Sequence, residues 1–169
     1  LAEDLLGAYV WGRYDTVTLP AWFPYRGMEN PCLACVNTTL LDANSELMTI
    51  IARKVVHSWT GNLVTAASWE HRWMNEGFTV FLSRKICGSL YSEPYRHFLS
   101  MTGWTNDLKP VVEEFGPEHE FTKLVQDHTN VDPCKAYSYL SGEKGSAFLF
   151  YLEQKLGGPG KIYCPRHCR

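Results

Sequence analysis

Two neighbouring segments decide the fold: Ile50-Ile51-Ala52-Arg53-Lys54-Val55-Val56-His57-Ser58-Trp59-Thr60-Gly61-Asn62 and Trp69-Glu70-His71-Arg72-Trp73-Met74-Asn75-Glu76-Gly77-Phe78-Thr79-Val80. In the second segment, steps of four, three and four predict a helix with four residues on one face: Trp69, Trp73, Glu76 and Val80. In the first, Arg53 and His57 are four residues apart and share a face of another helix. A carboxylate within an apolar stripe needs a partner, because burying a lone charge costs more than the packing returns. We therefore expect the two helices to face each other across a polar site.

Outside these helices the pattern predicts a short β part followed by a helical part, so the expected fold class is α+β. Alternation and β-branched residues predict strands at 14–19 and 35–40, separated by a turn-rich stretch from Pro20 to Pro31. Residues 1–11 read as a helix end that closes near Gly7 or Gly12. The two helices described above are expected at 45–59 and 69–86. Further helices are expected from about 92 onward and at 143–156, with a polar loop over 117–133.

The aromatic residues of the helical part are expected in the core: Trp69, Trp73, Phe148 and Tyr151. The histidines other than His57 are expected on the surface: His71, His97, His119, His128 and His167.

The composition is that of an ordinary globular protein, with 45% hydrophobic and 20% charged residues. Its 169 residues suit one domain. A formal net charge of −2 gives no reason to expect a nucleic-acid or membrane-surface partner. No apolar run approaches the roughly 20 residues that a membrane-spanning helix needs. The chain opens Leu1-Ala2-Glu3-Asp4, without an initiator Met or a signal-peptide pattern, so we read it as an internal segment or a truncated product.

Six cysteines are spread along the chain: Cys32, Cys35, Cys87, Cys134, Cys164 and Cys168. They are too sparse for a disulfide framework in a chain of this length, so we expect reduced thiols and a cytoplasmic location. Cys32 with Cys35, and Cys164 with Cys168 and His167, would be an alternative zinc clip. These pairs lie at opposite ends of the chain and lack the usual linker spacing, which disfavours the clip.

Three ordered motifs resemble those of the gluzincin zinc aminopeptidases, the group of leukotriene A(4) hydrolase and aminopeptidase B. Residues 25–32, Tyr25-Arg26-Gly27-Met28-Glu29-Asn30-Pro31-Cys32, resemble the G-x-M-E-N amine-binding motif. Residues 57–65 resemble the segment that closes the H-E-x-x-H helix, and residues 73–79 resemble the W-x-N-E-G segment that carries the third metal ligand. Eighteen residues separate His57 from Glu76, as in the family, and the similarity extends up to Pro159.

The resemblance implies an incomplete, thermolysin-like metallopeptidase catalytic domain over residues 1–160 and a divergent tail at 161–169. In this family two histidines and a glutamate hold zinc, and the Glu of H-E-x-x-H takes a proton from the zinc-bound water. A downstream Tyr stabilises the oxyanion, and the Glu of G-x-M-E-N binds the free amine of the substrate.

Carried over position by position, the resemblance leaves the metal site of this chain incomplete. His57 matches the second His ligand and Glu76 matches the third ligand. Arg53 stands at the first His position, Lys54 at the position of the catalytic Glu, and Gly142 at the position of the catalytic Tyr.

The substrate-binding positions are better preserved, because Glu29 matches the amine-binding Glu. The other residues that the resemblance places at the substrate are Tyr25, Gly27, Met28 and Tyr137. Arg26 replaces the first Gly of G-x-M-E-N, and Cys134 replaces an acidic residue near the tail of the substrate.

These replacements predict that zinc, the cofactor of the family, is not bound and that hydrolysis is lost. Arg53 stays protonated and has no accessible lone pair, so it cannot replace an imidazole on zinc. A charged Lys54 cannot act as the base, and losing a hydroxyl at Gly142 removes an oxyanion donor, typically about 10²–10³ in rate. We expect the Arg53 guanidinium to fill the metal position and pair with Glu76, and Lys54 to face Glu29.

Three functions stay open at this point. The first is an inactive relative of a zinc aminopeptidase, and the second is a working zinc-dependent aminopeptidase or epoxide hydrolase with an altered site. The third is a non-catalytic binder of peptide N-termini through Glu29. For His57, a hydrogen-bonded interior histidine is the alternative to a metal ligand, and for Glu29 the alternative is a carboxylate that caps backbone amides. Zinc content and peptide titration separate the three functions.

Overall fold

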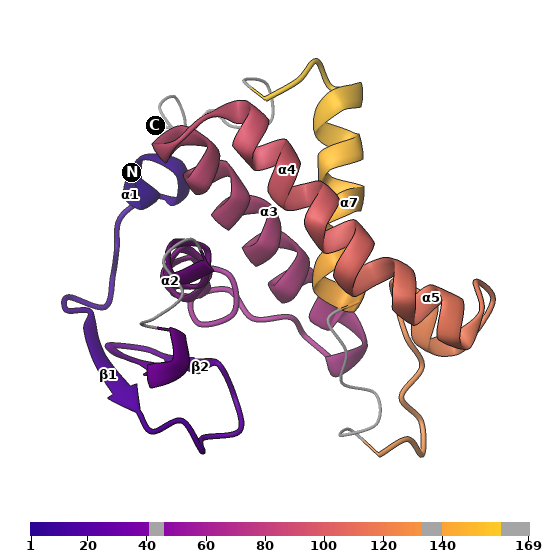
Figure 1. The fold of residues 1–169 in the computed structure, drawn as a ribbon, viewed down its shortest axis with the longest axis horizontal. Coiled ribbons are helices and arrows are strands. Elements are labelled where there is room, and N and C mark those ends of the chain that lie inside the picture. The colour runs from indigo at the N-terminus through magenta and orange to yellow at the C-terminus, as the bar shows by residue number, and fades with distance from the viewer. Residues whose placement is uncertain (41–45, 133–139, 160–169) are drawn as a thin grey trace.

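The computed structural model describes residues 1–40, 46–132 and 140–159. A small sheet and helix α2 form one side of the molecule, and helices α3, α4 and α7 pack together on the other (Figure 1). This short β part followed by a helical part confirms the α+β class. The elements run in the order α1 (Ala2–Leu6), β1 (Asp15–Leu19), β2 (Gly27–Asn30), β3 (Leu33–Asn37), η1 (Thr38–Leu40), α2 (Glu46–His57), η2 (Trp69–His71), α3 (Arg72–Leu90), α4 (Glu93–Gly103), η3 (Trp104–Leu108), α5 (Lys109–Phe115), η4 (Glu120–Thr122) and α7 (Leu140–Lys155).

The sheet has the strand order β1-β3-β2, with β3 parallel to β1 and antiparallel to β2. Strand β2 lies inside the stretch that was expected to be only turns, so that expectation was wrong. The strand forms because Pro31 and Cys32, with a φ of 67°, turn the chain tightly enough for Asn30 to pair with Leu33.

Strand β3 begins at Leu33, two residues before the expected start, and it ends at Asn37 instead of residue 40. The Asn37 side chain ends it, because its Oδ1 accepts hydrogen bonds from the backbone N–H and the hydroxyl of Thr39. On β2, Gly27 and Glu29 are half-buried while Met28 and Asn30 are exposed, so the alternation sends Glu29 toward the interior.

The helices lie close to their expected positions, with differences at their ends: α2 ends at His57, and α3 begins at Arg72 because Trp69–His71 forms the separate turn η2. Helix α1 is only five residues long and closes at Gly7. Helix α3 runs through Gly88 to Leu90, because Gly88 is the point where α4 approaches: a Cβ there would lie 3.0 Å from the Cβ of Arg96. Helix α7 begins at Leu140, three residues before the expected start. Helix α4, capped by the Ser92 hydroxyl, continues through the π-helical turn η3 into α5.

The core lies between α2, α3 and α7 and is built from Ala52, Val56, Phe81, Leu82, Ile86, Cys87 and Leu149. Three of the four aromatic residues expected there are exposed, namely Trp69, Phe148 and Tyr151, so that prediction was wrong. Helix α7 buries the face of Gly142, Gly145 and Leu149, which leaves Phe148 and Tyr151 on the other side.

Among the histidines expected on the surface, His97 and His119 are exposed. His71 and His128 are half-buried, each with a buried Nδ1 that makes no hydrogen bond. His167, Cys134, Tyr137, Cys164 and Cys168 lie outside the described residues.

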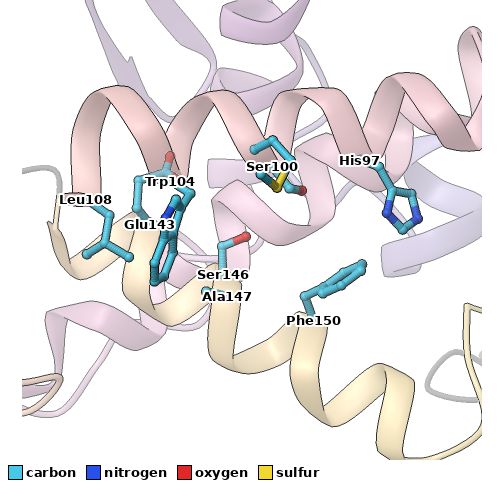
Figure 2. Close-up of a pocket in the computed structure, with 9 residues that line it drawn as sticks. His97, Ser100, Trp104, Leu108, Glu143, Ser146, Ala147 and Phe150 are labelled. Atoms are coloured by element: carbon cyan, nitrogen blue, oxygen red, sulfur yellow. The ribbon is translucent and has the colours of Figure 1, made fainter.

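A cavity of about 190 Å³ lies between α4, η3 and α7. Figure 2 shows the side chains of α4 and η3 on one side of it, and those of α7, including Phe150, on the other. The candidate site residues named from the sequence do not line this cavity within the described part of the chain, and Glu143 in its wall pairs with Arg84. In the part of the chain that the structure describes, no helix is both long and apolar enough to cross a membrane.

Candidate functional site

The site lies where β2, α2, α3 and α7 meet, and two glycines set its geometry. A Cβ on Gly77 of α3 would stand 2.8 Å from the Cα of Gly145 on α7, and the converse distance is also 2.8 Å. No side chain fits there, so the two helices cross with their backbones in contact. Because Gly77 follows Glu76, this crossing brings Glu76 beside Gly142, one turn before Gly145.

Lys54 of α2 reaches across to β2 and pairs with Glu29, as expected. Its Nζ donates to Glu29 Oε2 and to the carbonyl oxygen of Gly27, at 3.3 Å in the second case. Both charged side chains are mostly buried, with exposed fractions of 16% for Lys54 and 23% for Glu29. Burial by itself would raise the pKa of Glu29, but His57 and Lys54 outweigh it and the pKa is lowered.

His57 is buried and held in one orientation. Its Nδ1 lies 3.0 Å from the carbonyl oxygen of Thr60, which can only accept, so Nδ1 carries the proton. Nε2 then points between two carboxylates, 3.8 Å from Glu29 Oε1 and 4.0 Å from Glu76 Oε2. Burial lowers the pKa of His57, against the opposing influence of the two carboxylates. These contacts match the alternative considered for His57 from the sequence, a buried histidine held by a hydrogen bond.

Glu76 does not have the partner that the sequence predicted. Its Oε1 lies 3.8 Å from Nε of Arg72, one turn earlier on α3, and no ion pair to Arg53 is found among the described residues. The pairing with Arg72 prevails because that residue sits at i−4 on the same helix, whereas Arg53 must cross from α2. The predicted Arg53–Glu76 ion pair was therefore wrong.

Arg53 nevertheless lies next to the positions named by the motifs. A Cβ on Gly142 would stand 3.7 Å from Nη2 of Arg53, 3.6 Å from Cβ of Glu76 and 3.2 Å from Cγ2 of Val80. The Arg53 guanidinium thus lies next to Gly142, the position that the resemblance matches to the family's Tyr, where no hydroxyl is present.

Two asparagines that sequence reasoning did not single out connect the motifs. Asn62 donates from Nδ2 to the backbone carbonyl of Glu29 at 2.7 Å, and Asn75 Oδ1 accepts from the backbone N–H of Ala66 at 3.0 Å. Thr79 is fully buried, and its hydroxyl lies 2.5 Å from the Thr60 hydroxyl and 3.3 Å from Nδ1 of His57. Both asparagines lie inside the motifs quoted above. Their positions in those motifs could have marked them as structural contacts of the site.

Among the described residues, the other positions that the resemblance assigns to the substrate lie on strand β2 or just before it. Tyr25 is 60% exposed and Met28 is 49% exposed, whereas Gly27 lies directly under the Lys54 side chain. A cavity of about 130 Å³ lies between the sheet and α2, lined by Tyr14, Thr16, Thr18, Val36, Leu47, Ile51 and Lys54. Burial raises the pKa of Tyr14 in its wall to about 12.

The donor set does not fit a zinc ion. Zinc sites need at least three protein donors from nitrogen, sulfur or oxygen. Within the described ranges no group of three or more His, Cys, Asp and Glu side chains is arranged to hold a metal. The Glu29 carboxylate is already paired with the Lys54 ammonium group. Arg53 stands at the position that the resemblance matches to the first His ligand, and its guanidinium offers no lone pair to a metal. The chemistry of the site is therefore that of ion pairs between fixed side chains.

Comparison with known proteins identifies the relatives. The sequence profile of the Peptidase family M1 domain matches residues 1–162. The chain belongs to peptidase family M1. It is 52% identical to leukotriene A-4 hydrolase of Xenopus laevis over 158 residues. This match covers 94% of the present chain and 26% of the Xenopus protein. It is 47% identical over 155 residues to leucine aminopeptidase 2 of Neosartorya fischeri, covering 92% of this chain and 25% of the relative.

Solved structures of this M1 branch have the same fold. The structure of yeast leukotriene A-4 hydrolase in complex with bestatin superposes with a TM-score of 0.89 at 41% identity, over 95% of this chain and 26% of that one. The native enzyme from Saccharomyces cerevisiae superposes with a TM-score of 0.88. The present chain thus spans about a quarter of the length of the M1 relatives that it matches.

Proposed function

We propose that this chain is an M1 peptidase domain that no longer hydrolyses peptides. The ion pair between Lys54 and Glu29 carries the proposal. An ammonium group stands where the family has its carboxylate base, and it lies within the site instead of turning away to solvent. A cation that is already paired with a carboxylate has no lone pair with which to accept a proton from water.

The metal-ligand positions support the same proposal. His57 and Glu76 supply two donors, and Arg53 on the same face of α2 supplies none. Arg53 and Lys54 place two positive charges where the resemblance assigns a neutral imidazole and a carboxylate. Cations at these positions repel a divalent metal ion.

Binding of peptide N-termini through Glu29 is the weaker alternative, because Lys54 already occupies that carboxylate. The proposal includes a cytoplasmic location, which the free thiols of Cys32, Cys35 and Cys87 support.

Metal analysis and an activity assay on the purified chain test the proposal. After incubation with excess zinc and desalting, we expect far less than one zinc ion per chain and no hydrolysis of leucine p-nitroanilide above background. The double variant Arg53→His/Lys54→Glu restores a third nitrogen donor and the base carboxylate, so it should retain zinc.

The control adds Glu76→Gln to the double variant and should lose the metal again. Stoichiometric zinc in the wild-type chain, with hydrolysis that chelation abolishes, would overturn the proposal and establish a working zinc peptidase with an altered site.

A further inference from the structure

The cavity of about 190 Å³ between α4, η3 and α7 is lined mostly by apolar side chains, and two of its walls are aromatic. Figure 2 shows Trp104 toward one end of the cavity and Phe150 toward the other, with Ser146 of α7 between them. The Phe150 ring is held by an edge-on contact with His97, whose centroid lies 5.3 Å away. An apolar cavity of about 150 Å³ binds benzene in another protein, so a cavity of this size has room for a flat ring system.

The path of α4 explains why the cavity exists. At Gly103 the backbone of α4 lies directly against a buried ion pair, because a Cβ there would overlap with Nη2 of Arg84 and Oε2 of Glu143. The chain then enters the wider π-helical turn η3, and both end residues of this turn, Trp104 and Leu108, line the cavity. Turns of this kind are frequent at functional sites.

The inner wall of the cavity carries a buried carboxylate that is fixed in place. Glu143 is only 5% exposed, and its two oxygens accept from Nη2 of Arg84 at 2.9 and 2.8 Å. Nη1 of the same guanidinium donates to the hydroxyl of Ser146 at 3.3 Å. A carboxylate can accept about four hydrogen bonds, and Arg84 supplies one to each oxygen, so Glu143 can still accept from a ligand in the cavity.

We infer that this cavity binds a small, neutral, planar aromatic molecule that carries one N–H or O–H donor, as indoles and phenols do. The ring packs between Trp104 and Phe150, and the donor hydrogen-bonds to the Glu143 carboxylate. A neutral ligand is favoured because Arg84 already compensates the charge of Glu143, so an added cation would leave a buried positive charge unpaired. This site goes beyond the proposed loss of hydrolysis and uses none of the residues on which that proposal rests.

Titration of the 169-residue chain with indole tests the inference, with NMR shifts of the Trp104 side-chain N–H and the Ala147 backbone amide as the readout. Both groups belong to residues that line the cavity. We expect saturable shifts at both, with a dissociation constant of about 0.1–1 mM for a ligand of this size.

Benzofuran is the matched ligand control, because it keeps the two fused rings and replaces the N–H by an oxygen. It cannot donate to Glu143 and should bind at least tenfold more weakly than indole. The comparison changes the ligand and leaves the buried ion pair between Arg84 and Glu143 intact.

Two variants of α7 test the location of the site. Ala147 lines the cavity and is exposed, so Ala147→Phe should fill the space without disturbing the core and abolish binding. Gln154 is exposed on the same helix and outside the lining, so Gln154→Phe should leave the affinity within twofold. Trp104→Leu is the second cavity variant if Ala147→Phe does not fold, and it should weaken binding at least fivefold because one aromatic wall is lost.

The inference is overturned if neither reporter shows a saturable shift up to about 5 mM indole. Equal affinities for indole and benzofuran would also overturn it, as would indole binding that persists unchanged in the folded cavity variant. Zinc content and peptide hydrolysis are measured separately and without indole, so a failure here is distinguishable from a failure of the proposed loss of activity.

Discussion

The molecule contains two clusters of opposite charges that α3 separates, and they differ in burial. In the first, between β2, α2 and α3, Lys54 pairs with Glu29, and both side chains remain partly exposed. In the second, between α3, α4 and α7, Glu153 is fully buried and accepts from Lys85 at 2.5 Å and from Arg96.

The second cluster holds helices together and shows the geometry of a structural network. Arg84 adds to it on the same helix, donating from Nη2 to both carboxylate oxygens of Glu143 at 2.9 and 2.8 Å. These pairs join α3, α4 and α7, and each buried charge has an opposite charge close to it.

The first cluster joins its side chains more loosely. His57 Nε2 stands 3.8 and 4.0 Å from two carboxylates, and Glu76 stands 3.8 Å from Arg72. These separations exceed the usual hydrogen-bond distance, so no direct hydrogen bond joins His57 Nε2 to either carboxylate. Opposite charges that lie near each other therefore do not by themselves hold helices together; the second cluster does so through direct hydrogen bonds between its charged groups.

The largest effect is expected from Glu153→Gln, which leaves Arg96 and Lys85 without a buried carboxylate. We expect a loss of about 3–5 kcal/mol in the free energy of unfolding, measured by urea denaturation. The matched control is Glu113→Gln, which breaks an exposed pair with Lys109 and should cost less than about 1 kcal/mol. Similar losses in the two variants would contradict a structural role for the Glu153 cluster.

Acid should remove this same stabilisation. Burial by itself would raise the pKa of Glu153, but hydrogen bonds from Arg96 and Lys85 outweigh it and the pKa is lowered. A lowered folded-state pKa means that the stabilisation is complete above the unfolded pKa, about 4.3, and is lost as the pH falls through the folded value.

The stability difference between the wild type and Glu153→Gln should therefore be constant from about pH 7 to 5 and shrink below about pH 4.3. Urea midpoints across this range measure it. A difference that widens on acidification would contradict the assignment.

An intermediate effect is expected where the backbones of α3 and α7 touch. Gly145→Ala places a Cβ 2.8 Å from the Cα of Gly77, so the helices must separate at a cost of about 1–3 kcal/mol. Gly142→Ala on the same helix meets its nearest atom, Val80 Cγ2, at 3.2 Å, and alanine also favours the helix. Thermal denaturation of both should show Gly145→Ala clearly less stable, and equal Tm values would argue against close contact at this crossing.

The smallest effect on stability is expected in the site itself. A double-mutant cycle of Lys54→Met and Glu29→Gln should give a coupling energy below about 1 kcal/mol, because both partners are partly exposed. The same cycle with Arg96→Met and Glu153→Gln should give at least twice that value. A larger coupling at Lys54 and Glu29 would show that the first cluster is also a structural network.

Much of the site could be predicted from sequence, because its residues lie in short motifs. The i, i+4 spacing placed Arg53 and His57 on one face of α2, and the position of Lys54 allowed its pairing with Glu29 to be expected. The partner of Glu76 could not be predicted, since Arg72 and Arg53 were both available and only the path of each side chain in space decides between them.

The fold was less predictable where contacts between distant residues decide it. Strand β2 has no alternation strong enough to be recognised, and it exists because β3 pairs with it. Phe148 and Tyr151 look like core residues by type, but the face of α7 that packs on α3 is set by its glycines. Trp69 is exposed in the turn η2, before α3 begins.

The sequence by itself determined most of the helices, the α+β order, membership of family M1 and the identities of the side chains at Arg53, Lys54 and Gly142. These follow from local periodicity and from the fixed chemistry of each side chain. Only the tertiary structure decided that Lys54 also reaches the backbone carbonyl of Gly27, that Glu76 lies 3.8 Å from Arg72, and that Glu153 accepts from two cations. Such pairings join residues far apart in the chain or choose among several possible partners, and only the packing of the elements sets those distances.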